Sequence, residues 1–315
     1  MAIFLLPFLL GLLPWLKQRD WLYGCTLLTT GLFNIGWVII TGNISTFEFL
    51  LFSLTIFLLI KNKPNASSFV LGVMSGTKVI PILYMPAAIF LQKNIKGKLT
   101  ALTWSAAGFA LIPLLSLITS PKIFPWYIRQ LLGLIPGQHT PVHELDISPL
   151  NPSLSILVFS FFKADPASSP AAHMVFSLVI YILGFVLFFM LIKSKVASEQ
   201  KMPLLFSIGI ILLTLTLPRL KPYSFLPLLL CFYLISQHQS NLLKGIYLLL
   251  LSIIPTLSHL IYFYVENSDI LFESAILQTI LTLNQIFFAC IAAGLLIFCI
   301  LCQTRPNTVY IDAPE

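Results

Sequence analysis

Long apolar runs repeat along the whole chain, and they restrict it to one class of fold. Runs of about 15 to 27 residues, long enough for membrane-spanning helices, alternate with short charged or Pro/Gly-rich segments. Hydrophobic residues make up 58% of the 315 positions and charged residues only 9%, whereas soluble domains carry about 25% charged residues. The sequence therefore predicts an all-α, polytopic transmembrane bundle of about 9 to 11 membrane segments, forming a single domain over 1–315. The expected spans are 2–16, 21–41, 47–60, 99–118, 172–192, 203–217, 223–236, 245–265 and 276–302.

The positive charge is divided among short clusters between the apolar runs. The formal net charge of +7 does not indicate nucleic-acid binding, because no extended basic segment is present to carry it. Such clusters are typical of cytoplasmic loops under the positive-inside rule, which predicts a multi-pass protein of the cell membrane. The predicted cytoplasmic cations are Lys17, Arg19, Lys61, Lys63, Lys93, Lys96, Lys98, Lys193, Lys195, Lys201, Lys244 and Arg305. The segments 42–46, 119–171, 218–222 and 265–274 are then extracytoplasmic.

The stretch 66–92 differs from the other apolar runs because it is interrupted. Its centre reads LGVMSGTKVIPILYMP, with Lys78 in an apolar context and with Pro81 and Pro86 after it. A cation at membrane depth is costly, so Lys78 should face water, a partner or an anionic ligand. Because basic loops flank the stretch on both sides, we expect it to enter and leave at one face as a broken or re-entrant helix pair. A single kinked span with a snorkelling lysine is the alternative.

Residues 119–171 are the only long stretch between spans, and we expect an external segment with interfacial helices there. Its first part, SPKIFPWYIRQLLGLIPG, places Trp126 and several leucines on one side and Arg129 on the other. This is the pattern of a helix that lies in the headgroup layer. A second apolar piece follows Asn151, which can cap a short helix whose free N–H groups attract an anion. Simple packing of both helices on the bundle is the alternative.

Two cations lie where the charge rule predicts none. Arg219 and Lys221 stand in the sequence PRLKP on the predicted outer side. Since the positive-inside bias is general, a cation pair that violates it indicates a compensating ligand. A lipid phosphate in a site open to both lipid and water is such a ligand, and Lys78, Arg219, Lys221 and Arg129 are the cations available to hold it.

The histidines and cysteines do not indicate a metal site. His139 and His143 are four residues apart, but Pro141 between them argues against a shared helix face. Cys299 and Cys302 form one CxxC pair without a second pair or a nearby histidine, and we interpret them as membrane thiols. No cofactor is predicted; a divalent metal is possible but not indicated.

Three short elements occur in an order that carries a family resemblance. The first runs from Ser68 to Pro81 in a pattern like AGxxxGxxxxxKxxP, after the turn Gly42-Asn43. The second is Asn151-Pro152-Ser153-Leu154, and the third is the Pro-rich turn from Pro218 to Ser224, which includes an aromatic residue. In these elements, which extend over roughly residues 30–236, the chain resembles the polytopic glycosyltransferases of family 87.

The resemblance implies a fold and an activity. Similar proteins are GT-C enzymes that take a hexose, commonly mannose, from a polyprenyl phosphate donor and add it to a lipid-linked or glycan acceptor at the outer membrane face. The residues expected to bind the lipid phosphate are Lys78, Arg129, Asn151, Arg219, Lys221 and Tyr223. No nucleotide is needed for this chemistry, and the sequence has no Rossmann or P-loop glycine pattern.

The general base is harder to assign than the cations. The family carries a catalytic aspartate in its first external loop, and we expect that loop to lie upstream of Met1, which lacks the basic flank of a signal sequence. Asp20 is predicted on the inner side, so Glu48 and Asp146, followed by Glu144, are the candidate catalytic carboxylates. An inactive homologue, a partner subunit, or a transporter of an anionic lipid-linked substrate are the alternatives.

Overall fold

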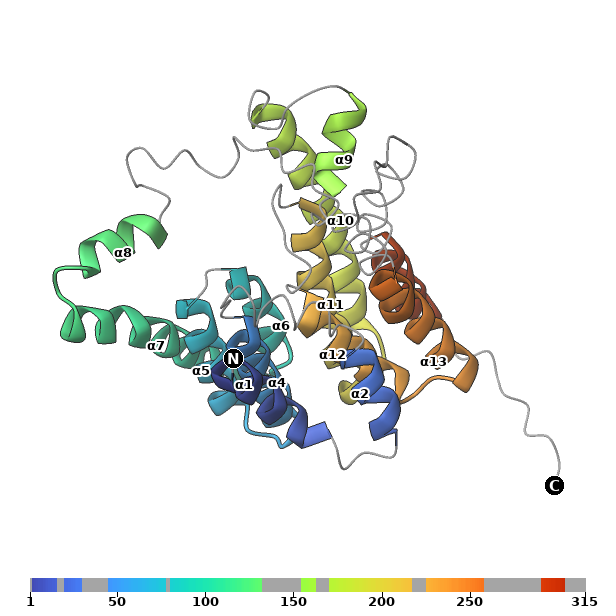
Figure 1. The fold of residues 1–315 in the computed structure, drawn as a ribbon, viewed down its shortest axis with the longest axis horizontal. Coiled ribbons are helices and arrows are strands. Elements are labelled where there is room, and N and C mark those ends of the chain that lie inside the picture. Colours follow the sequence, from blue (N-terminus) through green and yellow to red (C-terminus); the bar gives the residue numbers. More distant parts are fainter. Residues whose placement is uncertain are drawn as a thin grey trace, which may run out of the picture.

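The chain is built from helices packed side by side (Figure 1). The computed structural model describes residues 2–15, 20–29, 45–77, 80–131, 154–162, 170–216, 225–257 and 290–303. Within these ranges the structure contains helices and no strand, which confirms the all-α prediction. The predicted spans 47–60, 99–118, 172–192 and 203–217 each correspond to one observed helix.

The described helices have the following bounds. In chain order they are α1 (Ala2–Leu12), η1 (Leu13–Trp15), α2 (Trp21–Thr29), α4 (Ser45–Ile60), α5 (Pro64–Thr77), η2 (Ile80–Tyr84), α6 (Met85–Phe90), α7 (Ile95–Thr119), α8 (Phe124–Leu131), α9 (Leu154–Phe161), α10 (Pro170–Lys193), α11 (Ser198–Thr216), α12 (Leu226–Ser236), α13 (Asn241–Leu248) and the π-helix η5 (Leu249–Ile253). A last helix covers Cys290–Gln303.

Two of the described helices are long and apolar enough to cross a membrane. They are Ile95–Thr119 and Ala171–Lys193. Only 17% of either apolar stretch is buried inside the protein, so most of its side chains face outward, as expected for lipid-facing helices. The other apolar helices within the described ranges have 10 to 17 residues.

A very close helix–helix contact joins α5 to α7 through glycines. A methyl group added to Gly72 would lie 2.1 Å from the Ser105 carbonyl oxygen, and one added to Gly108 would lie 2.1 Å from the Phe69 carbonyl oxygen. Small residues four apart permit such an approach, and this is a common way for helices to associate in membranes. The glycines of the sequence motif therefore have a packing role, because no larger residue fits between the two backbones.

The same contacts fix the relative direction of α5 and α7. Gly72 meets Ser105, and Gly76, one turn later on α5, meets Phe109 and Ile112, further along α7. The two helices therefore run parallel. Since α5 and α7 start at the same end of the bundle, the chain between them must turn back.

Two prolines coincide with this reversal. α5 ends at Thr77, Pro81 lies in the 3-10 helix η2, and Pro86 lies in the first turn of α6, where a missing N–H does no harm. The turn 91–94 then leads into α7, whose first turn is capped by the Asn94 side chain, which accepts a hydrogen bond of 2.7 Å from Gly97 N. The predicted broken helix pair over 66–92 is thus present.

Contacts among the first helices set their directions relative to α5. Ser67 Oγ donates a 2.9 Å hydrogen bond to the Thr55 carbonyl, in keeping with the antiparallel hairpin formed by α4, the turn 61–63 and α5. Trp15 Nε1 donates a hydrogen bond of 2.8 Å to Ser53 Oγ. Earlier in both helices, the rings of Phe8 and Phe49 lie 5.1 Å apart. α1 therefore runs parallel to α4.

The pair α10 and α11 is antiparallel and packs beside the reversal. His173 Nε2 near the start of α10 lies 3.1 Å from the Thr216 carbonyl at the end of α11. The rings of Phe90 and Phe188 lie 5.6 Å apart, which places the end of α6 near the end of α10. The connection 194–197 therefore lies at the same end of the bundle as the turn 91–94.

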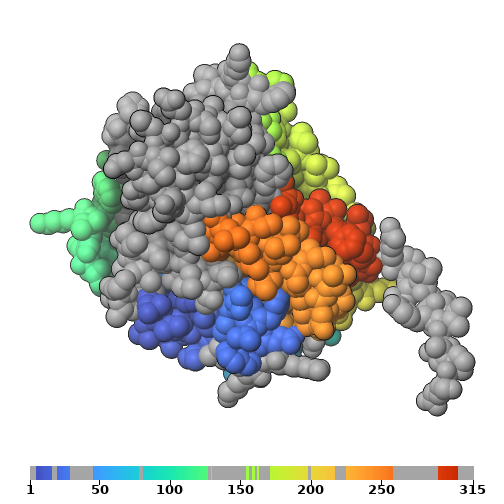
Figure 2. Space-filling model, turned by 45° about the vertical axis from the view of Figure 1, so that its right-hand side comes forward, coloured from blue at the N-terminus to red at the C-terminus, as the bar shows by residue number. Residues whose placement is uncertain are grey.

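The helices α2, α12 and α13 complete the bundle. Lys244 Nζ contacts Asp20 Oδ2 at 2.5 Å, and Ser252 Oγ donates a 2.9 Å bond to the Leu27 carbonyl, so α2 and the α13–η5 helix run side by side in the same direction. Figure 2 shows α2 in blue beside α13 in orange, with the last helix in red next to α13. Tyr247 Oη lies 2.9 Å from Cys299 Sγ and joins α13 to the last helix.

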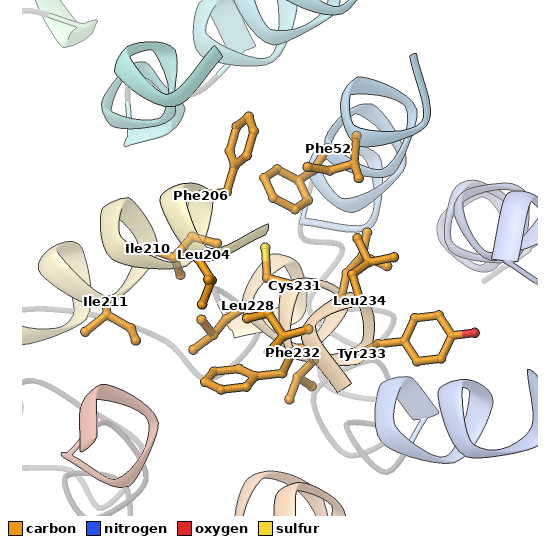
Figure 3. Packing of buried hydrophobic residues seen from close by; sticks show 14 of the residues in the cluster. Phe52, Leu204, Phe206, Ile210, Ile211, Leu228, Cys231, Phe232, Tyr233 and Leu234 are labelled. Atoms are coloured by element: carbon orange, nitrogen blue, oxygen red, sulfur yellow. The ribbon is translucent and has the colours of Figure 1, made fainter. Parts of the chain in front are cut away.

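The core lies where α4, α11 and α12 meet. Figure 3 shows Phe52, Phe206 and Cys231 pointing toward one another from these three helices. The rings of Phe52 and Phe206 lie 5.5 Å apart in an edge-to-face arrangement. Every side chain of α12 is buried, so this helix forms the centre of the bundle.

These directions collect nine of the ten described lysines, all except Lys122, at one end, which we call the basic end. It consists of the turns 61–63, 91–94 and 237–240, the connection 194–197 and the helix ends that border them. Its lysines are Lys61, Lys63, Lys93, Lys96, Lys98, Lys193, Lys195, Lys201 and Lys244. We call the other end, where α4 begins and α5 and α11 end, the opposite end.

We predict that the α5–α7 contact is essential for stability. Gly72→Ala must separate the two helices, because the new methyl group meets backbone atoms, and overpacking typically costs about 1 to 3 kcal/mol. Thermal unfolding of the purified protein in detergent should show a lower Tm. Gly245→Ala is the matched control: among the described residues, no atom outside its own helix backbone lies within 4 Å of its added Cβ, so the Tm should stay the same or rise. Equal Tm changes for both variants would contradict this packing role.

We also predict that the turns 61–63 and 91–94 lie on one side of the membrane. Cysteines introduced as Lys63→Cys and Lys96→Cys, in a chain without its native cysteines, should react with an impermeant maleimide from the same side of sealed vesicles. Lys122→Cys, placed just after the long helix α7, should react from the other side. Labelling of residues 63 and 96 from different sides would show that α5 and α7 are not parallel.

Candidate functional site

Two of the eight predicted site residues lie in the part of the chain that the structure describes. They are Glu48 in α4 and Arg129 in α8. Those outside the described residues are Lys78, Asp146, Asn151, Arg219, Lys221 and Tyr223. The geometry of the site therefore rests on Glu48, on Arg129 and on the described elements that flank the other six positions.

The flanking elements of two cation-bearing segments end in the same part of the bundle. α5 ends at Thr77, directly before Lys78, and α11 ends at Thr216, shortly before Arg219. α5 starts at the basic end and so does α11, so both finish at the opposite end. η2, which follows the first segment, packs on α11, where the Gly209 Cα faces Leu83 and Tyr84.

The short helix α9 lies at this end too. It begins at Leu154, shortly after Asn151, and it packs against α10 and α11. Phe159 of α9 is buried, and its ring lies 5.7 Å from the ring of His173, which itself contacts the last residue of α11. The described elements that flank Lys78, Asn151 and Arg219 thus lie at the opposite end of the bundle.

Glu48 is a buried carboxylate at the opposite end. It lies in the first turn of α4, with 6% of its surface exposed. The positive end of the helix dipole favours a carboxylate at this position, so Glu48 contributes to the start of the helix whatever else it does. Because α4 and α5 are antiparallel, residues before Thr55 on α4 lie opposite residues after Ser67 on α5. Glu48 therefore lies level with Met74, one turn before the end of α5.

The surroundings of Glu48 are polar as well as apolar. Ser45 and Thr46 in the same turn are buried, and Thr46 Oγ1 has no hydrogen-bond partner among the residues that the structure describes. Glu48 interacts electrostatically with Tyr84, whose ring lies 5.7 Å from that of Phe52. A buried carboxylate close to hydroxyl groups is a group that can accept a proton from a bound alcohol.

Tyr84 is a site-neighbouring residue that the sequence analysis did not single out. It has 2% of its surface exposed and lies where η2, α4 and α11 meet. The sequence feature that could have indicated Tyr84 is its position between Pro81 and Pro86 in the interrupted stretch, six residues after Lys78. An aromatic residue in an apolar run is too common a feature to be noticed without the electrostatic interaction with Glu48.

Arg129 has a different environment from Glu48. It is exposed in the last turn of α8, a short helix that contacts α7 and stands to one side of the bundle (Figure 1). Trp126 on the same helix is 50% exposed. The structure therefore places Arg129 on the surface beyond α7, and it does not bring Arg129 into the buried surroundings of Glu48.

Asp20 is engaged in an ion pair at the basic end. Its pairing with Lys244 places it at the basic end, away from Glu48. Among the residues that the structure describes, no three His, Cys, Asp or Glu side chains are grouped so that they could hold a metal ion. His139 and His143 lie outside these residues.

Comparison with known proteins identifies the family. The model of glycosyltransferase family 87 matches residues 2–218, which is more than half of the chain. No curated protein and no solved structure matches the sequence. The matched region includes α1 to α11 and the start of the PRLKP turn, and with it most of the segments that carried the resemblance. The chain therefore belongs to glycosyltransferase family 87 and is an all-helical membrane glycosyltransferase.

Proposed function

We propose that this glycosyltransferase transfers a hexose, with mannose as the first candidate, from a polyprenyl phosphate donor to a lipid-linked or glycan acceptor. The observation that carries the proposal is the arrangement at the opposite end: the described elements before Lys78, before Arg219 and after Asn151 all finish or begin there. Cations from separate segments that meet at a membrane face suit one shared phosphate.

The proposed location is the extracytoplasmic face. Nine described lysines lie at the basic end, and positive loops remain on the cytoplasmic side of membranes. The opposite end, with the buried Glu48, then faces outward. Lys78 and Arg219 are expected at that outer end. The free-energy cost of placing their charged side chains in the membrane is offset if they bind the donor phosphate.

The proposed reaction needs a stabilised leaving group and a base. The acceptor hydroxyl oxygen forms a bond to the anomeric carbon of the hexose, the bond from that carbon to the phosphate oxygen breaks, and polyprenyl phosphate leaves. Lys78, Arg219 and Lys221 would stabilise the charge that develops on the departing oxygen, which is usually a large contribution to catalysis. Asn151 and Tyr223 would add hydrogen bonds to the phosphate, and Arg129 would lie at the rim of the site.

The hydroxyl proton is transferred to a carboxylate. We propose Glu48 for this role because it is buried at the opposite end beside Tyr84, and Asp146 as the alternative. Amino-terminal Asp20 is unsuited, since it is paired with Lys244 at the basic end.

We predict that loss of a phosphate-binding cation weakens donor binding. A charge-assisted hydrogen bond contributes about 1.5 to 3 kcal/mol, so Lys78→Gln or Arg219→Gln should raise the Kd for an undecaprenyl- or dolichyl-phosphate hexose by about 10- to 100-fold. Lys122→Gln, which removes an exposed charge on the turn before α8, is the control and should bind as the unchanged protein does. If neither Lys78→Gln nor Arg219→Gln changes the Kd, the shared phosphate site is contradicted.

We predict a different effect for the base. Glu48→Gln keeps the side-chain shape but removes the proton acceptor, so the transfer rate should fall by about 10²- to 10⁴-fold while the donor Kd stays nearly constant. Asp146→Asn is the parallel variant. If Glu48→Gln transfers at the normal rate and Asp146→Asn does not, the base is Asp146. If neither variant is slowed, the base is another group and this assignment is wrong.

A further inference from the structure

Five lysines occupy two neighbouring turns of the basic end. Lys61 and Lys63 lie in the turn between α4 and α5, and Lys93, Lys96 and Lys98 lie in the turn 91–94 and the start of α7. Residues 60–64 and 90–100 contain no Asp or Glu, and none of these five lysines forms an ion pair with a residue that the structure describes. Because α5 and α7 are parallel and in contact, the two turns lie beside each other.

Exposed apolar side chains border these lysines. Ile95 is 73% exposed and Leu99 is 58% exposed, and the two lie four residues apart on one face of α7. Ile60 and Phe90, which end α4 and α6, are also exposed. This surface therefore offers cations beside an apolar strip, which matches a molecule with an anionic head and apolar chains.

Two of the lysines are held near aromatic rings. Lys61 Nζ lies 5.7 Å from the centre of the Phe57 ring, and Lys98 Nζ lies 5.1 Å from the centre of the Phe90 ring. Such contacts restrict the ammonium groups to the boundary between the apolar helices and the turns. Phe90 also packs on Phe188, which brings the end of α10 with its exposed Lys193 close to the same surface.

We propose that this surface, made of Lys61, Lys63, Lys93, Lys96, Lys98 and the apolar residues beside them, binds the headgroups of anionic phospholipids. The lysines contact the phosphate groups, and the acyl chains lie along Ile95 and Leu99. Lysines near an anionic leaflet each contribute favourably, and the contributions accumulate over a cluster of four to eight. This binding is independent of the proposed sugar transfer, which takes place at the other end of the molecule.

The test compares two lipids with the same acyl chains. The full-length protein in a neutral detergent is titrated with phosphatidylglycerol or phosphatidylcholine, and bound lipid is counted by native mass spectrometry. We expect a preference for phosphatidylglycerol that decreases by about fivefold for each lysine removed in the double variant Lys93→Gln/Lys96→Gln. The charge-matched double variant Lys122→Gln/Lys163→Gln, at positions that follow α7 and α9, should keep the preference.

Three results would overturn the proposal. One is equal binding of the two lipids by the unchanged protein. Another is an equal loss of preference in both double variants, which would indicate a general effect of net charge. The third is displacement of phosphatidylglycerol by soluble glycerol phosphate at similar concentration, which would show a site for free phosphate without a role for the apolar strip. If the Lys93/Lys96 variant does not fold, Lys93→Arg/Lys96→Arg replaces it and should retain the preference, and its loss would contradict the proposal.

Discussion

The contact between α5 and α7 is the constraint on which the rest of this arrangement depends. At Gly72 and Gly108 the two backbones are so close that an added methyl group would overlap a carbonyl oxygen. In a membrane, where lipid chains are as apolar as leucine, this kind of close packing is a main source of helix association. Because the two helices are also parallel, residues between them must fold back, and Pro81 and Pro86 lie in the segment that does so.

This reversal separates two kinds of surface. The turns 61–63 and 91–94 meet at the basic end, where exposed lysines lie beside exposed apolar residues. At the opposite end α5 stops at Thr77, beside the start of α4 with its buried Glu48. Had the stretch 66–92 crossed the membrane once, one of the two basic turns would lie at the same end as Glu48. The broken helix pair is therefore what allows a site for a membrane-bound anionic donor to be proposed at one end and a lipid-binding surface at the other.

Much of the fold could be predicted from the sequence, because apolar run length, loop charge and proline position each have a direct structural consequence in a membrane. The break near Pro81 is an example. The contact of α5 with α7 was not predicted, since Gly72 and Gly76 were assigned to a family motif and nothing in the pattern named Ser105 or Gly108 as the partner. Tyr84 was missed for a similar reason: its interaction with Glu48 joins two helices, and periodicity within either helix carries no information about it. For the site, the sequence proposed Glu48 by its place at an outer helix end, and the structure adds that it is buried.

The central claim is that the segments after Thr77, before Leu154 and after Thr216 form one site for a polyprenyl phosphate sugar. The most direct measurement is photo-crosslinking of the membrane-embedded protein with a polyprenyl phosphate hexose that carries a photoreactive group next to the phosphate. Peptide mapping should then find adducts in 74–86 and 216–226, and an excess of unlabelled donor should suppress them. Adducts confined to the turns 61–63 and 91–98, or distributed over α7 and α10 regardless of competing donor, would contradict a phosphate site at the opposite end.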